Sequence, residues 1–161
     1  MSGAFPARRL GLAEYASRPY AAMARLDAAI ELDDGLRELI RVRASEINGC
    51  AFCIDMHWKD ARAAGETEER LYSLSAWRES PLYGDRERAA VELCEAITLV
   101  ADTHVPDDVW DRAAAHFERE ELAQLVFAIT AINAWNRLVI SARTEPGHYQ
   151  PPVREAARAQ R

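Results

Sequence analysis

Apolar residues along this chain recur every three or four positions, the spacing of one face of an α-helix. Met23, Leu26 and Ile30 show the pattern first, and it returns in six later segments. The pattern predicts helices over residues 20–32, 36–47, 50–64, 67–76, 86–101, 106–117 and 120–142. No segment alternates apolar and polar residues as a half-buried strand would. The chain is therefore predicted to be all-α.

Turn and capping residues separate the predicted helices. Asn48-Gly49 is predicted to be a turn because both residues tolerate left-handed backbone angles. Gly65 is expected to end the helix that follows this turn. Asp85 is expected to be the N-cap of the long helix over 86–101, and Pro106 to lie in the first turn of the next helix.

Composition is that of one globular domain. The 161 residues are 49% hydrophobic and 29% charged, with abundant helix-favouring Ala, Leu, Glu and Arg. We expect the folded domain to span residues 20–152, preceded by an arm at 1–19 and followed by a frayed tail at 153–161. One domain of this length can bury a substantial core.

Charge and hydropathy exclude several classes of partner. A net charge of −6 gives no electrostatic reason to bind nucleic acid or anionic lipid. No apolar run approaches the roughly 20 residues that span a bilayer, and the first residues do not resemble a signal peptide. We therefore expect no nucleic-acid partner, no membrane association and a cytoplasmic, reducing location.

The stretch "EINGCAFCIDMHW" carries the candidate chemistry. Cys50, Cys53 and His57 stand at positions i, i+3 and i+7, so they share one stripe of a helix. The preceding turn places both sulfurs at the helix start, where unpaired N–H groups and the helix dipole favour a thiolate. The spacing therefore predicts a redox-active dithiol with a neighbouring base.

A histidine that acts as a base needs an acceptor for its other ring nitrogen. Glu46 lies one turn before Cys50, whereas Glu38 lies on the preceding helix, which should fold back against the cysteine helix. The residues alone leave both carboxylates open as the partner of His57.

The cysteine stripe is also compatible with a zinc site or with inert packing. A zinc site would need a fourth ligand, with His104, His116 and Glu38 as candidates, but three ligands on one helix stripe suit tetrahedral closure poorly. Inert packing is the other alternative, because cysteine is often buried. We favour redox use, with no metal and no cofactor beyond the Cys50–Cys53 dithiol.

The remaining polar residues of note have simpler expected roles. Cys94 is expected to fill the core. Asn133 and Asn136 interrupt an apolar helix, so they should satisfy backbone groups at a helix crossing or a subunit contact. The other histidines are expected to be solvated or to cap helices: His104, His116 and His148.

Four stretches together resemble the alkylhydroperoxidase D-like branch of the carboxymuconolactone decarboxylase family. They are "RELIRVRASEINGCAFCIDMHWKDARAAGE", "GDRERAAVELCEAITLV", "HVPDDVWDRAAAHF" and "ITAINAWNRLVISARTEPGHYQPP". The resemblance implies a helical bundle of the alkylhydroperoxidase D-like type. It also implies a proton relay of Glu38, Cys50, Cys53 and His57. Phe52 stands where alkylhydroperoxidase D itself carries an additional histidine.

The resemblance implies a peroxidase cycle in antioxidant defence. Cys53 would attack an organic or hydrogen peroxide with His57 as base, the sulfenic acid would condense with Cys50, and an external dithiol would reduce the disulfide. Relatives assemble into trimers, hexamers or dimers, so a homo-oligomer is expected. A general dithiol-disulfide reductase, or a non-catalytic redox-sensing scaffold, are the alternatives.

Overall fold

The computed structural model describes residues 6–152, and over this range the chain forms helices and no strand. This confirms the all-α prediction. Residues 1–5 of the predicted arm and the predicted tail at 153–161 lie outside the described residues. The elements are α1 Leu12–Tyr15, α2 Ser17–Ala28, α3 Asp34–Asn48, α4 Ala51–Ala63, α5 Glu68–Ser73, the 3-10 turn η1 Leu74–Ala76, α6 Asp85–Thr98, α7 Val100–Thr103, α8 Asp107–Ala114 and α9 Arg119–Ala142.

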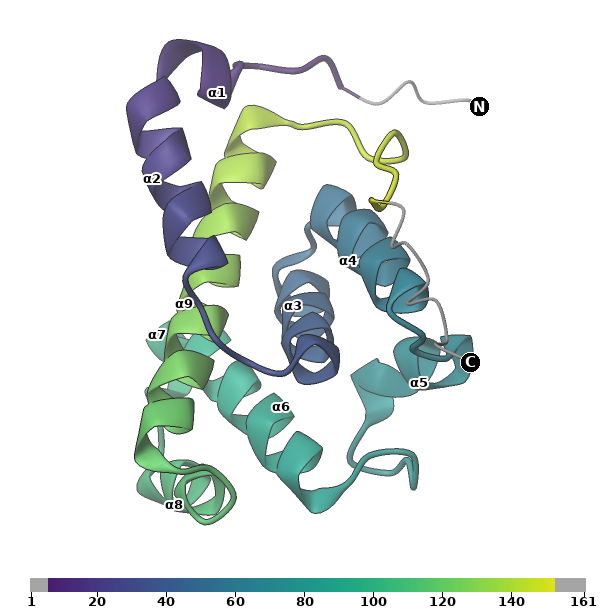
Figure 1. The fold of residues 1–161 in the computed structure, drawn as a ribbon, viewed down its shortest axis with the longest axis vertical. Coiled ribbons are helices and arrows are strands. Elements are labelled where there is room, and N and C mark those ends of the chain that lie inside the picture. The colour runs from purple at the N-terminus through teal and green to yellow at the C-terminus, as the bar shows by residue number, and fades with distance from the viewer. Residues whose placement is uncertain (1–5, 153–161) are drawn as a thin grey trace, which may run out of the picture.

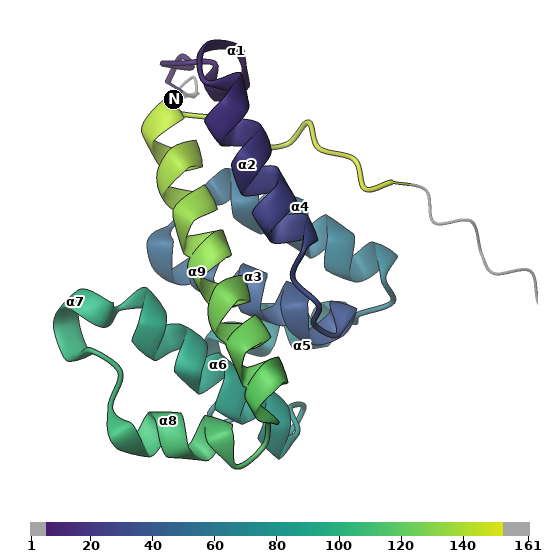
Figure 2. The ribbon, with the colours of Figure 1, turned by 60° about the vertical axis from the view of Figure 1, so that its left-hand side comes forward.

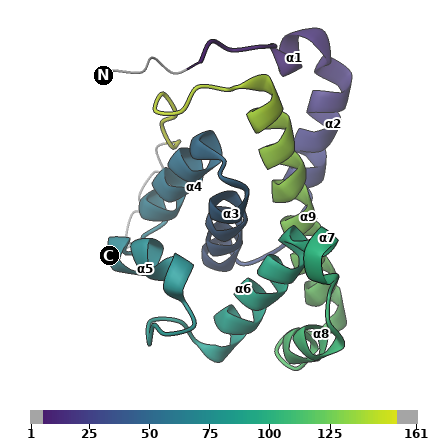
Figure 3. The same cartoon turned by 180° about the vertical axis from the view of Figure 1, so that it is seen from behind.

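Helix α3 lies at the centre of the bundle, with α4, α6 and α9 around it (Figures 1 and 3). Its start is capped by Asp33, whose carboxylate accepts a hydrogen bond from the Leu36 backbone N–H at 2.9 Å. Its side chains Leu39, Ile40 and Val42 are fully buried. Helices α4, α6 and α9 therefore pack against α3 on three sides. This packing keeps α3 rigid, so it can support a site.

Helix α9 supplies the other large part of the core, including the buried Leu125, Ile129 and Ile132. Among the described helices it alone is long and apolar enough to cross a membrane. This is weak evidence for a membrane span, because core helices of soluble proteins also meet the same criteria. Helix α2 lies along α9 and has no buried residue (Figure 2). Tyr20 of α2 meets Trp135 of α9 edge to face, with 5.1 Å between the ring centroids.

Several predicted helix boundaries are wrong. The helix predicted over 20–32 runs from Ser17 to Ala28, because the chain must turn so that Ile30 packs against α9. The helix predicted over 86–101 is interrupted at Leu99, between α6 and α7. Asp85 is the first residue of α6 and not its N-cap; the Glu87 carboxylate accepts the Gly84 N–H instead, at 2.9 Å.

The predicted role of Pro106 is wrong, whereas the predicted roles of Gly49 and Gly65 are confirmed. Pro106 is the N-cap residue of α8 and not part of its first turn, and α8 ends at Ala114, short of the predicted 117. Gly49 and Gly65 adopt left-handed angles, with φ of 66° and 99°, directly after α3 and α4. Both glycine predictions are confirmed, and the turn at Gly49 brings α4 back against α3.

Candidate active site

The turn between α3 and α4 positions the two cysteines. Gly49 ends α3 in the left-handed region, and the Cys50 N–H then donates to the Ser45 carbonyl at 2.9 Å. Cys50 is thereby fixed as the N-cap residue of α4, and Cys53 follows in the first turn. Each cysteine is only 1% exposed, and both are free thiols.

Cys50 is the sulfur that the surroundings stabilise as a thiolate. The Cys53 thiol donates to it, and this bond, with the backbone N–H groups of Cys53 and Phe52 and the Asn136 amide, lowers the pKa of Cys50 although burial opposes it. The pKa of Cys53 is raised, first because its thiol is engaged by Cys50, and then by burial and the negative charge of Cys50. Cys50 therefore carries the first negative charge and Cys53 keeps its proton.

His57 lies one turn beyond Cys53 and is held by Glu38. The distance between His57 Nδ1 and Glu38 Oε2 is 2.9 Å, and both side chains are buried. Glu46, the other candidate partner, instead accepts a hydrogen bond from Arg43 at 2.9 Å. The structure thus brings Glu38 and His57 together, and pairs Glu46 elsewhere.

Arg41 completes the polar end of the site. Its guanidinium donates to Glu38 Oε1 at 2.7 Å and to Asp27 Oδ2 at 2.8 Å. Burial acts to raise the pKa of Glu38, but the hydrogen bonds and positive charges of His57 and Arg41 outweigh it and the pKa is lowered. Glu38 therefore stays ionised as an acceptor for the imidazole over the neutral pH range.

A cavity of about 300 Å³ opens beside these groups. Cys53 and His57 line it, together with Arg41 and Asp27, whereas Cys50 does not. The rest of the wall is mostly apolar and comes from α2, α4 and α9: Tyr20, Ala24, Ala28, Phe52, Met56, Ile132, Trp135 and Val139. Of the two cysteines, therefore, Cys53 is the one that borders this cavity.

Sequence reasoning missed Arg41 as a neighbour of the site, and it missed the contact of Asn136 with the cysteines. Asn136 bonds to both cysteines, donates to Ser45 Oγ at 3.0 Å, and accepts from the Asn48 amide at 2.8 Å. Asn136 lies at a helix crossing, as predicted, but it bonds side chains there, whereas Asn133 also donates to the Ile129 backbone carbonyl at 2.9 Å. Arg41 could have been found because it follows Glu38 by three residues on the same helix face.

The other predicted roles have mixed outcomes. Cys94 is fully buried, which confirms it as a core residue. Asn133 accepts from the Asn48 amide at 2.9 Å and donates to Thr98 Oγ1 at 2.9 Å, so it too belongs to the crossing of α9 with its neighbours. The three remaining histidines are exposed, as expected: His104, His116 and His148.

One group of described residues is close enough to hold a metal ion. Ligand atoms of Glu38, His57 and Asp60 lie within 4.8 Å of one another. However, Arg41 already donates to Glu38, and Tyr149 donates to Asp60 at 2.7 Å. Because a cationic guanidinium occupies the same carboxylate, this group fits a hydrogen-bonded relay better than a cation site.

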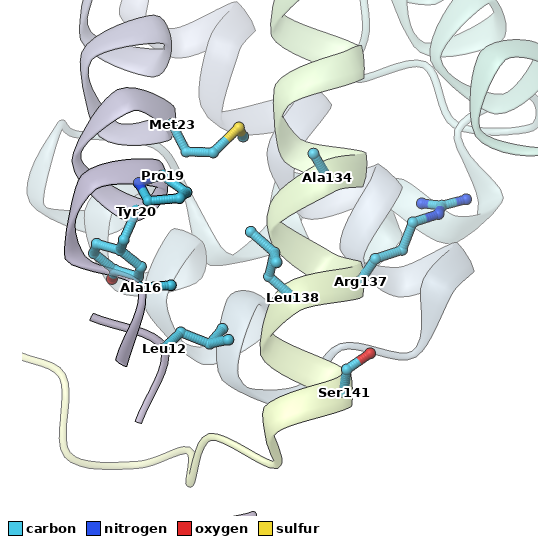
Figure 4. A pocket seen from close by; sticks show the side chains of 9 residues that line it. All are labelled: Leu12, Ala16, Pro19, Tyr20, Met23, Ala134, Arg137, Leu138 and Ser141. Atoms are coloured by element: carbon cyan, nitrogen blue, oxygen red, sulfur yellow. The ribbon is translucent and has the colours of Figure 1, made fainter. Parts of the chain in front are cut away.

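A second groove of about 470 Å³ lies between α2 and α9 (Figure 4). Met23, Pro19 and Tyr20 face it from α2, and Leu138 of α9 reaches toward them. The groove contains none of the four predicted site residues. Tyr20 lines both the groove and the cysteine cavity, so it lies between the two.

Comparisons with known proteins show the family to which this chain is similar. The model of the carboxymuconolactone decarboxylase family matches residues 14–96, just over half of the chain. The uncharacterized protein YdfG of Bacillus subtilis (strain 168) is 51% identical over 105 residues, which cover 65% of this chain and 71% of YdfG.

Two solved structures have the same fold. A protein of unknown function from Agrobacterium tumefaciens, suggested to be the antioxidant defence protein AhpD, superposes with a TM-score of 0.85 and 38% identity, covering 89% of this chain and all of that one. The debrominase Bmp8 superposes with a TM-score of 0.72 and 18% identity, covering 82% of this chain and 74% of its own. The resemblance inferred from the sequence is confirmed.

Proposed function

This chain belongs to the carboxymuconolactone decarboxylase family, and we propose that it is a thiol oxidoreductase that reduces hydroperoxides through Cys50 and Cys53. One observation carries the proposal: Cys53 and His57 line the same cavity, while Cys50 lies behind Cys53 as the stabilised thiolate. The fold alone does not select the reaction, since a debrominase shares it. The site residues carry that part of the argument.

The first step is attack by Cys53. Cys53 holds its proton in the resting site, so His57, oriented by Glu38, accepts that proton only as the sulfur attacks the terminal oxygen of the hydroperoxide. The O–O bond breaks, the sulfur is oxidised to a sulfenic acid, and the leaving alkoxide takes up the proton to form an alcohol.

The second step uses the thiolate of Cys50. Its sulfur attacks the Cys53 sulfur, an S–S bond forms, and the hydroxide that leaves is protonated to water. Two electrons have passed from the dithiol to the peroxide. An external dithiol then restores both thiols by disulfide exchange, and its own two sulfurs become oxidised. The lowered pKa of Cys50 suits this resolving role, because no further deprotonation is needed.

The cavity favours an organic hydroperoxide over a charged one. Its walls are mostly apolar, and Phe52 contributes an aromatic ring at the position of the additional histidine of alkylhydroperoxidase D. At its polar end both guanidinium arms of Arg41 are already engaged by carboxylates. A substrate with an apolar body and a neutral hydroperoxide head therefore fits this surface.

Location and assembly are further parts of the proposal. A dithiol that must be re-reduced suits the reducing cytoplasm. Exposed apolar side chains on α2 and α9, among them Leu26, Phe127 and Ile140, offer surface that a second copy of the chain could cover in a dimer, trimer or hexamer.

Stopped-flow oxidation of the reduced protein with cumene hydroperoxide tests the proposal. We expect rapid loss of two thiols per chain, abolished in Cys53→Ser and unchanged in the matched control Cys94→Ser. A reaction no faster than that of free cysteine would refute peroxidase activity. In that case reduction of a model disulfide by the same protein would identify a disulfide reductase, and inertness in both assays would leave a redox-sensing scaffold.

A further inference from the structure

The segment after α9 is attached to the outer side of α4 by three hydrogen bonds. The Gly147 N–H donates to Asp55 Oδ2 at 3.1 Å, and Lys59 donates to the Tyr149 carbonyl at 3.0 Å. The Tyr149 hydroxyl donates to Asp60 Oδ1 at 2.7 Å. Three charged residues on one helix therefore hold residues 147–149 in place, although these lie about ninety positions away in sequence.

Asp60 also lies beside the Glu38–His57 pair. Its carboxylate, that of Glu38 and a ring nitrogen of His57 are all within 4.8 Å of one another. A hollow of about 190 Å³, distinct from the cysteine cavity, is lined by Glu38, Asp60 and Tyr149. The pair is thus bordered by the cysteine cavity at His57 and by the C-terminal segment at Glu38.

We propose that Asp60 and Tyr149 are positioning residues for the Glu38–His57 pair. An oxygen of Asp60 lies within 4.8 Å of a ring nitrogen of His57, so a small rotation of an unbonded Asp60 side chain would let it compete with Glu38 for a ring N–H. Tyr149 occupies Asp60 by donating to it, and this leaves the imidazole on Glu38. The inference rests on the proposed thiol chemistry, because it assigns to the C-terminal segment control over the base of that reaction.

The chemistry of Tyr149 supports this arrangement. Burial, followed by the hydrogen bond and charge of Asp60, raises the pKa of Tyr149 to about 12. The phenol therefore remains protonated at every working pH and always donates. The charged and titratable groups near the imidazole come from four elements. Glu38 of α3 and Asp60 of α4 lie within 4.8 Å of a ring nitrogen, Asp27 of α2, Arg41 of α3 and Cys53 of α4 line the same cavity, and Tyr149 of the C-terminal segment bonds Asp60.

Tyr149→Phe and Asp60→Asn should shift the pH dependence of cumene hydroperoxide reduction in opposite directions. Without its phenol donor, the Asp60 carboxylate is free to accept from the imidazole, favours the protonated ring, and moves the acid midpoint up by about 0.5 unit. Asp60→Asn removes the charge and moves the midpoint down by a similar amount. The matched control is Tyr72→Phe, which alters an exposed tyrosine of α5 and should leave the midpoint unchanged.

The double variant shows whether Tyr149 acts through Asp60. In the Asp60→Asn background, Tyr149→Phe should produce no upward shift, because the carboxylate on which it acts is gone. A purely structural role would instead lower the melting temperature or the rate at all pH values without moving the midpoint. If both single variants keep the wild-type midpoint within about 0.1 unit, the inference is overturned.

An NMR titration of the His57 ring separates this inference from the proposed function. The ring signal, assigned with His57→Gln, should show the same opposite shifts whether or not peroxide is turned over. Shifted ring titrations in a protein without peroxide turnover would support the positioning role and refute the peroxidase. Normal peroxide turnover with unshifted ring titrations would support the peroxidase and refute the positioning role.

Discussion

The start of α4 and the interior of α6 both bury cysteine, with opposite consequences. Cys50 and Cys53 are 1% exposed and Cys94 is 0% exposed. Yet the pKa of Cys50 is lowered, whereas burial raises the pKa of Cys94 to about 12. Equal burial has therefore produced one stabilised thiolate and one inert thiol.

The difference lies in the available donors. At the start of α4 the Phe52 and Cys53 N–H groups have no partner within the helix, so they are free to bond a sulfur. Inside α6 the backbone N–H groups are used within the helix, and the Cys94 thiol donates to the Ile40 carbonyl at 3.6 Å. Hydrogen bonds from Thr98 and from the Ala44 backbone act to lower the pKa of Cys94, but burial outweighs them. Local donors, more than exposure, decide which cysteine is stabilised as a thiolate.

The largest expected effect is on thiolate content. A titration followed at the ultraviolet absorbance of the thiolate should show one group ionising below the ordinary thiol value of 9.0. Cys50→Ser should abolish this early ionisation, because it removes the sulfur that the helix start stabilises. Cys94→Ser should leave it intact. Early ionisation that persists without Cys50 would place the thiolate on Cys53 and reverse the assignment.

Glu38→Gln should slow peroxide-driven thiol oxidation by about 10–100-fold, the usual cost of losing the group that orients a functional histidine. The matched control is Glu46→Gln, which alters a carboxylate of the same helix that bonds Arg43 and not His57. Rate constants from stopped-flow fluorescence or thiol counting give the comparison. If Glu46→Gln slows the reaction and Glu38→Gln does not, the relay is wrongly assigned.

Asn136→Ala should raise the ionisation midpoint of Cys50 by about one pH unit, because an amide hydrogen bond to the sulfur is lost. It should also cost about 1–3 kcal/mol of stability, since the Asn48 and Ser45 side chains lose a buried partner. Asn133→Ala is the control. It breaks bonds to Asn48 and Thr98 but none to a cysteine, so it should lower stability and leave the thiolate midpoint in place.

The smallest expected effect is on acid stability. The folded-state pKa of Glu38 is lowered from its ordinary value of 4.5. Its contribution to folding stability is therefore present above pH 4.5 and is lost as the pH falls through the folded-state pKa. The folded-state pKa of Glu46 is raised, chiefly by burial, so its contribution is present below 4.5 and is lost as pH rises. Glu38→Gln should therefore cost more stability near pH 7 than near pH 3, and Glu46→Gln the opposite, in urea unfolding at both values. Equal costs at both pH values would contradict the two shifts.

Helix content was predictable because it depends on local periodicity. The turn at Gly49 and the stop at Gly65 were confirmed for the same reason, since a left-handed residue is a local requirement. Boundaries set by packing were missed. Helix α2 ends early so that Ile30 can reach its small cluster with Ala128 and Ala131 of α9, a contact nearly a hundred residues away in sequence.

The site also contains features that local spacing determines and features that only the packing of distant segments determines. The order of Cys50, Cys53 and His57 on one helix follows from their spacing, because residues three and four apart share a helix face. The choice of Glu38 over Glu46 does not, since both are plausible until the angle between α3 and α4 is known. Asn136 and Tyr149 come from α9 and the segment beyond it, and only the folded chain brings them to the cysteines and to Asp60.

By itself the amino-acid sequence determined that this protein is helical, that two of its thiols stand at the start of one helix, and that an imidazole follows them one turn later. These are short-range properties of the backbone and of side-chain spacing. Only the tertiary structure decided which sulfur carries the charge, which carboxylate holds the imidazole, and which cavity reaches Cys53. Those outcomes depend on hydrogen-bond donors and apolar walls supplied by distant segments, and no local pattern encodes their distances.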